Sequence, residues 1–123
     1  MHTAARCLRV LVVDDEPLIR WSIAETLGAG GHHVTEAPDG ASALRALADG
    51  PDPDLVLLDF RLPDSNDLGL LAEIRRVAPS TPVIMMTAFG TPDVAAGALK
   101  LGASRVLNKP FNMHDLEDLV RSV

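Results

Sequence analysis

The chain contains little cysteine and few aromatic side chains. Among its 123 residues there is one cysteine, Cys7, and no tyrosine, and aromatic residues make up 3% of the sequence. A single cysteine cannot form an internal disulfide, which fits a reducing, cytoplasmic location best. Proteins that bind single-stranded nucleic acid stack the bases on aromatic side chains, so the scarcity of these side chains argues against that function.

Positive charge is scarce as well. Eleven Lys and Arg residues stand against seventeen Asp and Glu residues, which gives a net charge of −6, and the longest basic run is Arg75-Arg76. Binding to DNA or RNA phosphates requires a basic face, and an anionic membrane surface would repel an acidic chain. We therefore expect no direct contact of this domain with nucleic acid or with a membrane.

Long apolar segments are also missing. The N-terminus lacks the apolar stretch of a signal peptide. The least charged window, residues 77–92, is interrupted by Pro79, Pro82 and Gly90, so it does not form a membrane span. Hydrophobic residues nevertheless make up 47% of the chain, which is typical of a folded domain. We expect a single domain over residues 1–123, with residues 1–7 as an N-terminal tail.

Short apolar segments alternate with helical patterns along the chain. The segments that end near residues 13, 58 and 86 are continuous apolar runs, as in parallel strands that are buried on both faces, whereas the second strand is more polar, as an edge strand is. The expected strands are residues 8–13, 33–37, 55–59, 83–87 and 104–108, and the expected helices are residues 17–27, 41–48, 68–78, 92–101 and 113–121. This alternation predicts an α/β fold with a five-stranded, doubly wound parallel sheet.

Several residues are typical of helix starts. Pro17 and Pro92 fit a first helical turn, where the missing N–H costs nothing. Asp39, Thr91 and Asn112 are candidate N-caps for the helices that follow them.

Polar side chains follow the expected strands at their carboxyl ends. Asp14 and Asp15 follow the first strand, Asp59 ends the third, Thr87 ends the fourth and Lys109 follows the fifth. In an open parallel sheet, ligands bind beyond these ends, so we expect all five side chains to converge on one crevice. Each has a simple structural explanation when taken alone, such as helix capping by the first two. Three carboxylates at one edge, however, repel one another unless a cation holds them, and Mg²⁺ prefers such oxygen ligands.

The motifs around these residues resemble the receiver domains of two-component response regulators. The likeness extends over nearly the whole chain from about Leu8 onward and is greatest to receivers of nitrogen-regulation-type, enhancer-binding regulators. It implies a flavodoxin-like (βα)₅ sandwich with strand order 2-1-3-4-5. The matching segments are residues 10–17 (Val-Leu-Val-Val-Asp-Asp-Glu-Pro), 55–63 (Leu-Val-Leu-Leu-Asp-Phe-Arg-Leu-Pro), 83–88 (Val-Ile-Met-Met-Thr-Ala) and 108–111 (Asn-Lys-Pro-Phe).

The resemblance implies a phosphoacceptor and a magnesium site. Asp59 would attack the phosphoryl group of a phosphohistidine on a partner kinase. Asp15, Asp59 and the backbone carbonyl of Arg61 would bind Mg²⁺ directly, and Asp14 would act mainly through a metal-bound water. Such transfer needs alignment and charge stabilisation, so the domain is expected to perform only its own phosphoryl transfer and slow autodephosphorylation, without being an enzyme.

The resemblance also implies how the phosphoryl group is held and read. Lys109, which would precede a cis peptide bond to Pro110, would pair with one phosphoryl oxygen, and the Thr87 hydroxyl would bond another. Movement of Thr87 would switch an output domain, a partner or a homodimer through the surface formed by the fourth helix, the fifth strand and the fifth helix.

The first helix is the expected docking surface for the kinase or for a phosphotransfer protein. Ile19, Ile23 and Leu27 recur at helical spacing and should face the sheet. Leu18, Trp21 and Ser22 should then lie nearer the solvent. By analogy with the family they would contact the partner, although packing on a neighbouring helix or self-association accounts for Trp21 equally well.

Several positions depart from the family pattern. Val106 stands where many receivers have a Tyr or Phe that moves with the threonine, which leaves the exit route of the signal open. Asn66-Asp67 replace a usual Gly but tolerate the same left-handed backbone. Arg61 and Phe89 flank the site, where they either slow hydrolysis of the phosphoryl group or simply point to the solvent.

Other functions remain alternatives. A pseudo-receiver would signal through protein contacts without phosphate. An aspartyl phosphatase of the haloacid dehalogenase type uses similar residues but carries its nucleophile after the first strand, within an Asp-x-Asp motif. Flavin or dinucleotide binding is disfavoured, because acidic residues stand after the first strand where a phosphate cradle is needed. The sequence is compatible with a stand-alone receiver and with the front of a longer regulator.

Overall fold

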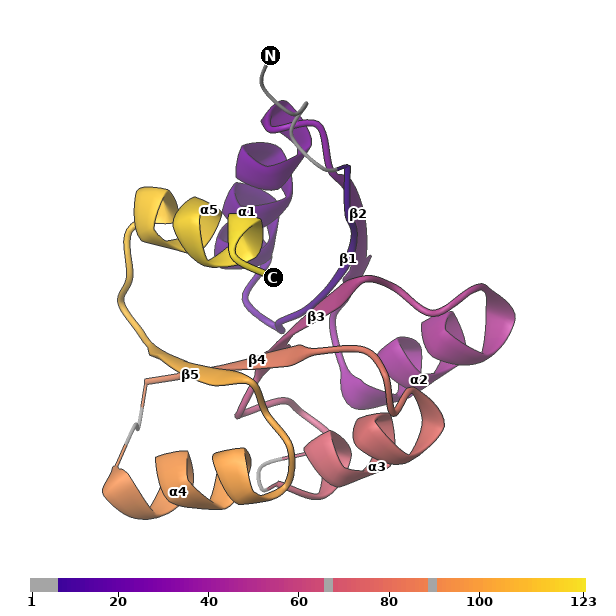
Figure 1. Cartoon of the computed structure of the whole chain (residues 1–123), viewed down its shortest axis with the longest axis vertical. Helices are drawn as coiled ribbons and strands as arrows, with labels where there is room; N and C mark the ends of the chain where they lie inside the picture. Colours follow the sequence, from indigo (N-terminus) through magenta and orange to yellow (C-terminus); the bar gives the residue numbers. More distant parts are fainter. Residues whose placement is uncertain (1–6, 66–67, 89–90) are drawn as a thin grey trace.

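The structure is a computed structural model that describes residues 7–65, 68–88 and 91–123. Within these residues a parallel sheet is covered by helices on both faces (Figure 1). The strands are β1 (Arg9–Val13), β2 (His33–Ala37), β3 (Leu55–Asp59), β4 (Val83–Thr87) and β5 (Arg105–Asn108). The helices are α1 (Pro17–Ala29), α2 (Gly40–Asp49), α3 (Gly69–Val77), α4 (Pro92–Lys100) and α5 (Met113–Arg121).

The strand order β2-β1-β3-β4-β5 confirms the order that the family resemblance implied. All neighbouring strands pair in parallel. The polar strand β2 lies at one edge, and the apolar strands β1, β3 and β4 lie inside the sheet, as predicted. Element boundaries agree with the expected ones to within one residue, except that α1 extends two residues further, to Ala29.

Each face of the sheet packs against its own set of helices. In β3 the side chains of Leu55 and Leu57 join the core under α1 and α5, and those of Val56 and Leu58 join the core under α2, α3 and α4. Figure 1 shows these two layers on opposite sides of the sheet. Because successive side chains of a strand point to opposite faces, a strand covered on both sides must be apolar at every position. Polar residues therefore collect at the strand ends.

The predicted N-caps are confirmed. The side chains of Asp39, Thr91 and Asn112 accept hydrogen bonds from backbone N–H groups in the first turns of α2, α4 and α5. Helix α1 differs, because Glu16 occupies its N-cap position without a side-chain cap hydrogen bond, and Pro17 begins the helix. Neither Asp14 nor Asp15 is therefore the N-cap residue of α1, although Oδ1 of Asp14 accepts a hydrogen bond from the Glu16 N–H.

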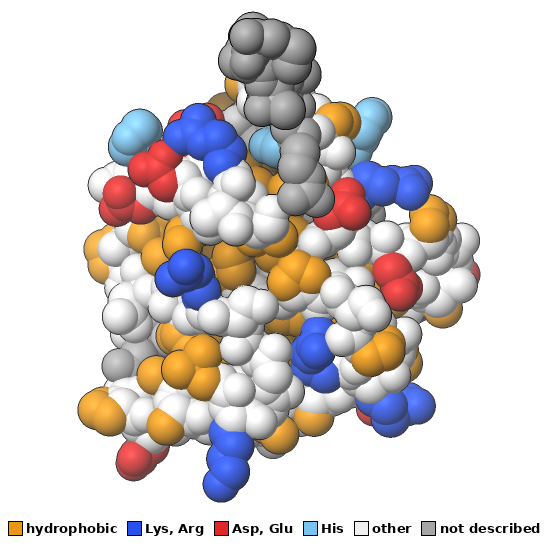
Figure 2. Space-filling model, in the orientation of Figure 1, with side chains coloured by type: hydrophobic (Ala, Val, Ile, Leu, Met, Phe, Trp, Pro, Cys, Tyr) orange, Lys and Arg blue, Asp and Glu red, His pale blue; other side chains and the backbone are white. Residues whose placement is uncertain are grey.

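Basic and acidic side chains are interspersed on one face of the molecule (Figure 2). On the face shown in Figure 2, the Lys and Arg side chains lie apart from one another, with acidic side chains between several of them. This face offers no continuous basic patch to a phosphate backbone. None of the helices in the described ranges has the length and apolarity to cross a membrane.

Candidate functional site

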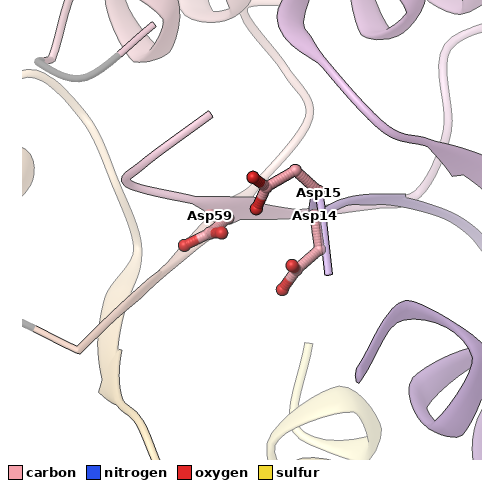
Figure 3. A group of neighbouring side chains, drawn as sticks. All are labelled: Asp14, Asp15 and Asp59. Carbon is pink, nitrogen blue, oxygen red and sulfur yellow. The ribbon is translucent and has the colours of Figure 1, made fainter. Parts of the chain in front are cut away.

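Three carboxylates meet at the carboxyl edge of the sheet. Asp14 and Asp15 follow β1 and Asp59 ends β3, and these two strands are hydrogen-bonded neighbours. Each residue offers an oxygen that lies within 4.8 Å of the oxygens of the others. Figure 3 shows the three side chains grouped around a common space. Asp14 and Asp59 are buried and Asp15 is exposed, so the cluster combines a buried floor with an open side.

Asp14 is held by hydrogen bonds at every polar atom. Its N–H donates to the Ala37 carbonyl at 3.1 Å, and its carbonyl accepts from Nη1 of Arg20 at 2.7 Å. Of its carboxylate oxygens, Oδ1 accepts from the Glu16 N–H at 2.9 Å and Oδ2 from Nζ of Lys109 at 2.9 Å. An unpaired buried carboxylate is costly, and at 0% exposure Asp14 has a protein partner for each of its carboxylate oxygens.

Lys109 is the cation that the fold brings to the carboxylates. Its backbone N–H donates to the Thr87 carbonyl at 2.8 Å, and its peptide bond to Pro110 is cis, as the resemblance implied. Its Nζ lies 2.9 Å from Asp14, 3.2 Å from Glu16 and 3.5 Å from Asp59.

The surroundings of Lys109 favour its protonated form. Burial disfavours the charged amine, but the hydrogen bond and attraction from Asp14, with further attraction from Asp59, outweigh burial and raise the pKa of Lys109. The lysine therefore remains charged throughout the physiological pH range.

The pKa of the Asp59 carboxyl is raised by its surroundings. Burial, and then repulsion by Asp14, raise the pKa of Asp59 from 3.8 to about 6, although Lys109 and a backbone hydrogen bond from Arg61 oppose the rise. One lysine thus does not compensate the crowded carboxylates fully. A further cation at this position would favour the ionised, nucleophilic form of Asp59.

An open hollow of about 260 Å³ lies over the carboxylates, and we call it the acidic hollow. It is lined by Asp15, Glu16, Asp59, Arg61, Thr87, Ala88 and Lys109. It has room for a metal ion with several waters and for a small group beside it. The residues therefore fit Mg²⁺, which prefers oxygen ligands and retains waters when it binds to proteins.

A larger hollow, of about 480 Å³, lies between α2 and α3, and both of its carboxylates are already paired with other groups of the protein. Its acidic residues are Asp64 and Glu73. The Asp64 carboxylate accepts hydrogen bonds from the N–H groups of Gly40 and Ala41, and Glu73 is paired with Arg76 on its own helix. These carboxylates stabilise helices, and they lie outside the acidic hollow.

The structure brings the five predicted site side chains together. Asp14 contacts Lys109, and Asp15, Asp59, Thr87 and Lys109 line the acidic hollow. Thr87 is buried at the end of β4. Arg61 lines the same hollow, while ligation of a metal by its carbonyl stays a prediction.

Two residues of the site were not predicted. Glu16 pairs with Lys109, and Arg20 donates to the Asp14 carbonyl. Glu16 directly follows the two aspartates, which is a signal for its place beside them, whereas no spacing in the sequence indicates the contact of Arg20 with the Asp14 carbonyl.

The expected orientation of α1 is confirmed. Ile23 and Leu27 are buried and Ile19 packs against the same core, whereas Leu18 is 79% exposed and Trp21 is 58% exposed. Ser22 is partly buried.

The positions that depart from the family pattern are described only in part. Val106 is partly buried and packs against the core under α2, α3 and α4. Phe89 and the Asn66-Asp67 pair lie outside the described residues.

Comparison with known proteins identifies relatives over almost the whole chain. The family model described as response regulator receiver domain matches residues 10–121. The DNA-binding transcriptional regulator NtrC of Escherichia coli K12 is 40% identical over 111 residues, which cover 90% of this chain and 24% of that protein. The response regulator protein PilR of Pseudomonas aeruginosa is 43% identical over 112 residues, which cover 91% of this chain and 25% of that protein. The chain thus spans about a quarter of the length of these relatives.

Solved structures agree in fold. The receiver domain of NtrX from Brucella abortus is 38% identical, with a TM-score of 0.84 over 92% of this chain and 95% of that one. A CheY-like response regulator receiver domain protein from Methanospirillum hungatei JF-1 is 27% identical, with a TM-score of 0.89 over 95% of this chain and 93% of that one. The likeness to nitrogen-regulation-type regulators, expected from the motifs, is confirmed by NtrC and NtrX.

The raised pKa of Asp59 predicts how the stability of the metal-free domain depends on pH. A carboxyl whose pKa is higher in the folded state than in the unfolded state contributes stability that is fully present below pH 3.8 and is lost as the pH rises through about 6. In EDTA, the free energy of unfolding of Asp59→Asn relative to that of the wild type should therefore increase by roughly 1–2 kcal/mol as the pH rises from 4 to 7.5.

Urea denaturation of both proteins at several pH values in this range measures the gain. Saturating Mg²⁺ is the control, since a bound cation stabilises the ionised carboxylate and should reduce the difference. A difference between the two proteins that does not change with pH would contradict this account of the crowded carboxylates.

Proposed function

Because this chain belongs to the receiver domain family of two-component response regulators, we propose that it accepts a phosphoryl group on Asp59 and relays that state to an output. The observation that carries the proposal is the position of Asp59. Its carboxylate is buried at the end of a central strand, beside two further carboxylates and a lysine, and it lines the acidic hollow. The proposed nucleophile, Asp59, thus has both negative carboxylates and a positive lysine beside it.

Mg²⁺ is the proposed cofactor. Asp15 and Asp59 would bind it directly, together with the backbone carbonyl of Arg61, which lines the same hollow. Asp14 is assigned to an outer position, through a metal-bound water, because both of its carboxylate oxygens already accept hydrogen bonds from the protein. When bound, the ion supplies positive charge that favours ionised Asp59 and offsets the charge of an incoming phosphoryl group.

Phosphoryl transfer then proceeds through residues of this chain. An oxygen of Asp59 attacks phosphorus, the P–N bond to the histidine of the partner kinase breaks, and its electron pair returns to the imidazole. Lys109, whose Nζ lies 3.5 Å from Asp59, is the proposed partner of one phosphoryl oxygen. The hydroxyl of Thr87, at the end of the neighbouring strand, is the proposed donor to a second oxygen. Alignment and charge suffice for this step.

The partners follow from the exposed surfaces and from the family. A histidine kinase or phosphotransfer protein is proposed to dock on α1 near Leu18, Trp21 and Ser22, since Leu18 and Trp21 expose apolar area. The output is proposed to be switched through the surface of α4, β5 and α5, on which Leu99 exposes apolar area.

Because NtrC is a DNA-binding transcriptional regulator about four times as long as the aligned region, transcriptional control by a further domain is the proposed output. The same relatives suggest a cytoplasmic location, where regulators of transcription meet DNA. We propose no turnover of an external substrate.

A phosphorylation-independent interaction module is the second candidate, and one observation favours it. Val106 packs against the core where many receivers have an aromatic switch residue, so the usual partner of Thr87 is missing. The complete acidic cluster favours the phosphoacceptor instead. An aspartyl phosphatase is disfavoured because the buried Asp59 ends β3, whereas those enzymes carry the nucleophile after their first strand.

Intact-mass spectrometry after incubation with acetyl phosphate tests the function. We expect one phosphoryl adduct that requires Mg²⁺ and is absent from Asp59→Asn. Asp64→Asn is the matched control, because Asp64 follows the same strand but belongs to the other hollow, and it should retain the adduct. No adduct on the wild type, together with no beryllofluoride complex, would favour the interaction module.

Removal of the lysine tests the proposed role of its charge. Lys109→Ala should slow adduct formation by roughly 100-fold, because a buried cation that meets developing negative charge contributes several kcal/mol to the rate. Lys100→Ala is the matched control, since the chain contains only these two lysines and Lys100 is exposed at the end of α4. Equal rates for the two variants would remove Lys109 from the phosphoryl site.

A further inference from the structure

Arg20 links the acidic loop to the edge of the sheet. It lies in the first turns of α1, and its Nη1 donates to the carbonyl of Asp14 at 2.7 Å. Its Nε donates to Oε1 of Glu36, in the edge strand β2, at 3.1 Å. The side chain is only 18% exposed, so the guanidinium is fixed by partners on two different elements. A fork of fixed donors is what distinguishes arginine from lysine in such a position.

The carbonyl that Arg20 holds belongs to the peptide that joins Asp14 to Asp15. A peptide group is planar, so fixing the direction of its oxygen also fixes the position of the next Cα. That Cα carries the Asp15 side chain, which is exposed and lies beyond the paired residues of β1. On the N-terminal side of Asp14, its backbone N–H donates a hydrogen bond to the Ala37 carbonyl of β2. The loop is thus anchored on both sides of Asp14.

Charge alone does not explain an arginine at this place. The neighbouring carboxylates fit Mg²⁺, and a positive side chain close to a dication site repels the ion. The ion pair with Glu36 is also weak as a source of stability, because the Glu36 side chain is 44% exposed and solvent screens the pair. The contribution of Arg20 therefore lies in its hydrogen bond to the backbone.

We propose that Arg20 is a positioning residue for the metal site: it orients the Asp14–Asp15 peptide so that the carboxylates of both residues stay grouped with that of Asp59. This inference rests on the proposed function, because it concerns the same magnesium site. It assigns no contact between Arg20 and the ion. Groups that orient metal ligands in this way commonly change metal affinity by an order of magnitude or more.

The test is the dissociation constant for Mg²⁺, measured by titration calorimetry on the whole chain at pH 7.5. Arg20→Met retains most of the side-chain length and removes both donors. Positioning predicts that it weakens Mg²⁺ binding by roughly 10-fold. The lost positive charge acts in the opposite direction, so an electrostatic role predicts tighter binding. The sign of the change therefore separates the two explanations.

Two further variants complete the test. Arg20→Lys keeps the charge and one donor, and it should bind Mg²⁺ with intermediate affinity, which also provides a readout if Arg20→Met does not fold. Arg45→Met is the matched control, because Arg45 is an exposed arginine of α2 whose hydrogen bond to Ser42 is made within its own helix. It should leave the affinity within about two-fold of the wild type, since an exposed charge is screened.

The outcomes separate this inference from the proposed function. Unchanged or tighter Mg²⁺ binding by Arg20→Met and Arg20→Lys, beside a wild type that binds Mg²⁺, overturns the positioning role alone. A wild type that binds no Mg²⁺ overturns the proposed magnesium site and this inference with it. A loss of affinity in Arg45→Met as large as that in Arg20→Met also contradicts the positioning role.

Discussion

Repulsion between carboxylates at one edge of the sheet is the constraint on which the site depends. β1 and β3 are neighbours, so Asp14, Asp15 and Asp59 cannot lie far apart. Burial and then repulsion by Asp14 raise the pKa of Asp59, and Lys109 opposes this rise without cancelling it. Three carboxylates this close together favour the binding of a cation, and a divalent ion with oxygen ligands fits them. Arg20, which anchors the loop through its backbone, maintains the crowding.

The fold explains why this charge is found where it is. The interior strands are buried on both faces and are apolar along their length, as Leu57 and Leu58 are on opposite sides of β3. Polar side chains occur in these strands only at their ends, as Arg9 does in β1, Asp59 in β3 and Thr87 in β4. The parallel order β2-β1-β3-β4-β5 directs all of these ends to one side. An α/β sheet with apolar strands therefore produces a reactive edge without any special architecture.

The sequence was sufficient to predict the elements, the strand order by family resemblance, and the five side chains that meet, because strand ends are read directly from apolar runs. It was not sufficient for the contacts of Glu16 and Arg20. Those depend on side-chain conformations and on the path of a short loop, which no periodicity encodes. The capping explanation for Asp14 was incomplete for the same reason, since one of its carboxylate oxygens accepts from the Glu16 N–H at the start of α1 and the other accepts from Lys109.

The most direct test of the account is a crystal structure at neutral pH with Mn²⁺ as a stand-in for Mg²⁺, located by its anomalous scattering. The account predicts one ion in the acidic hollow, bound by the carboxylates of Asp15 and Asp59 and by the carbonyl of Arg61, with Asp14 reached through a water. An acidic hollow without an ion, or an ion only between α2 and α3 beside Asp64, would contradict it.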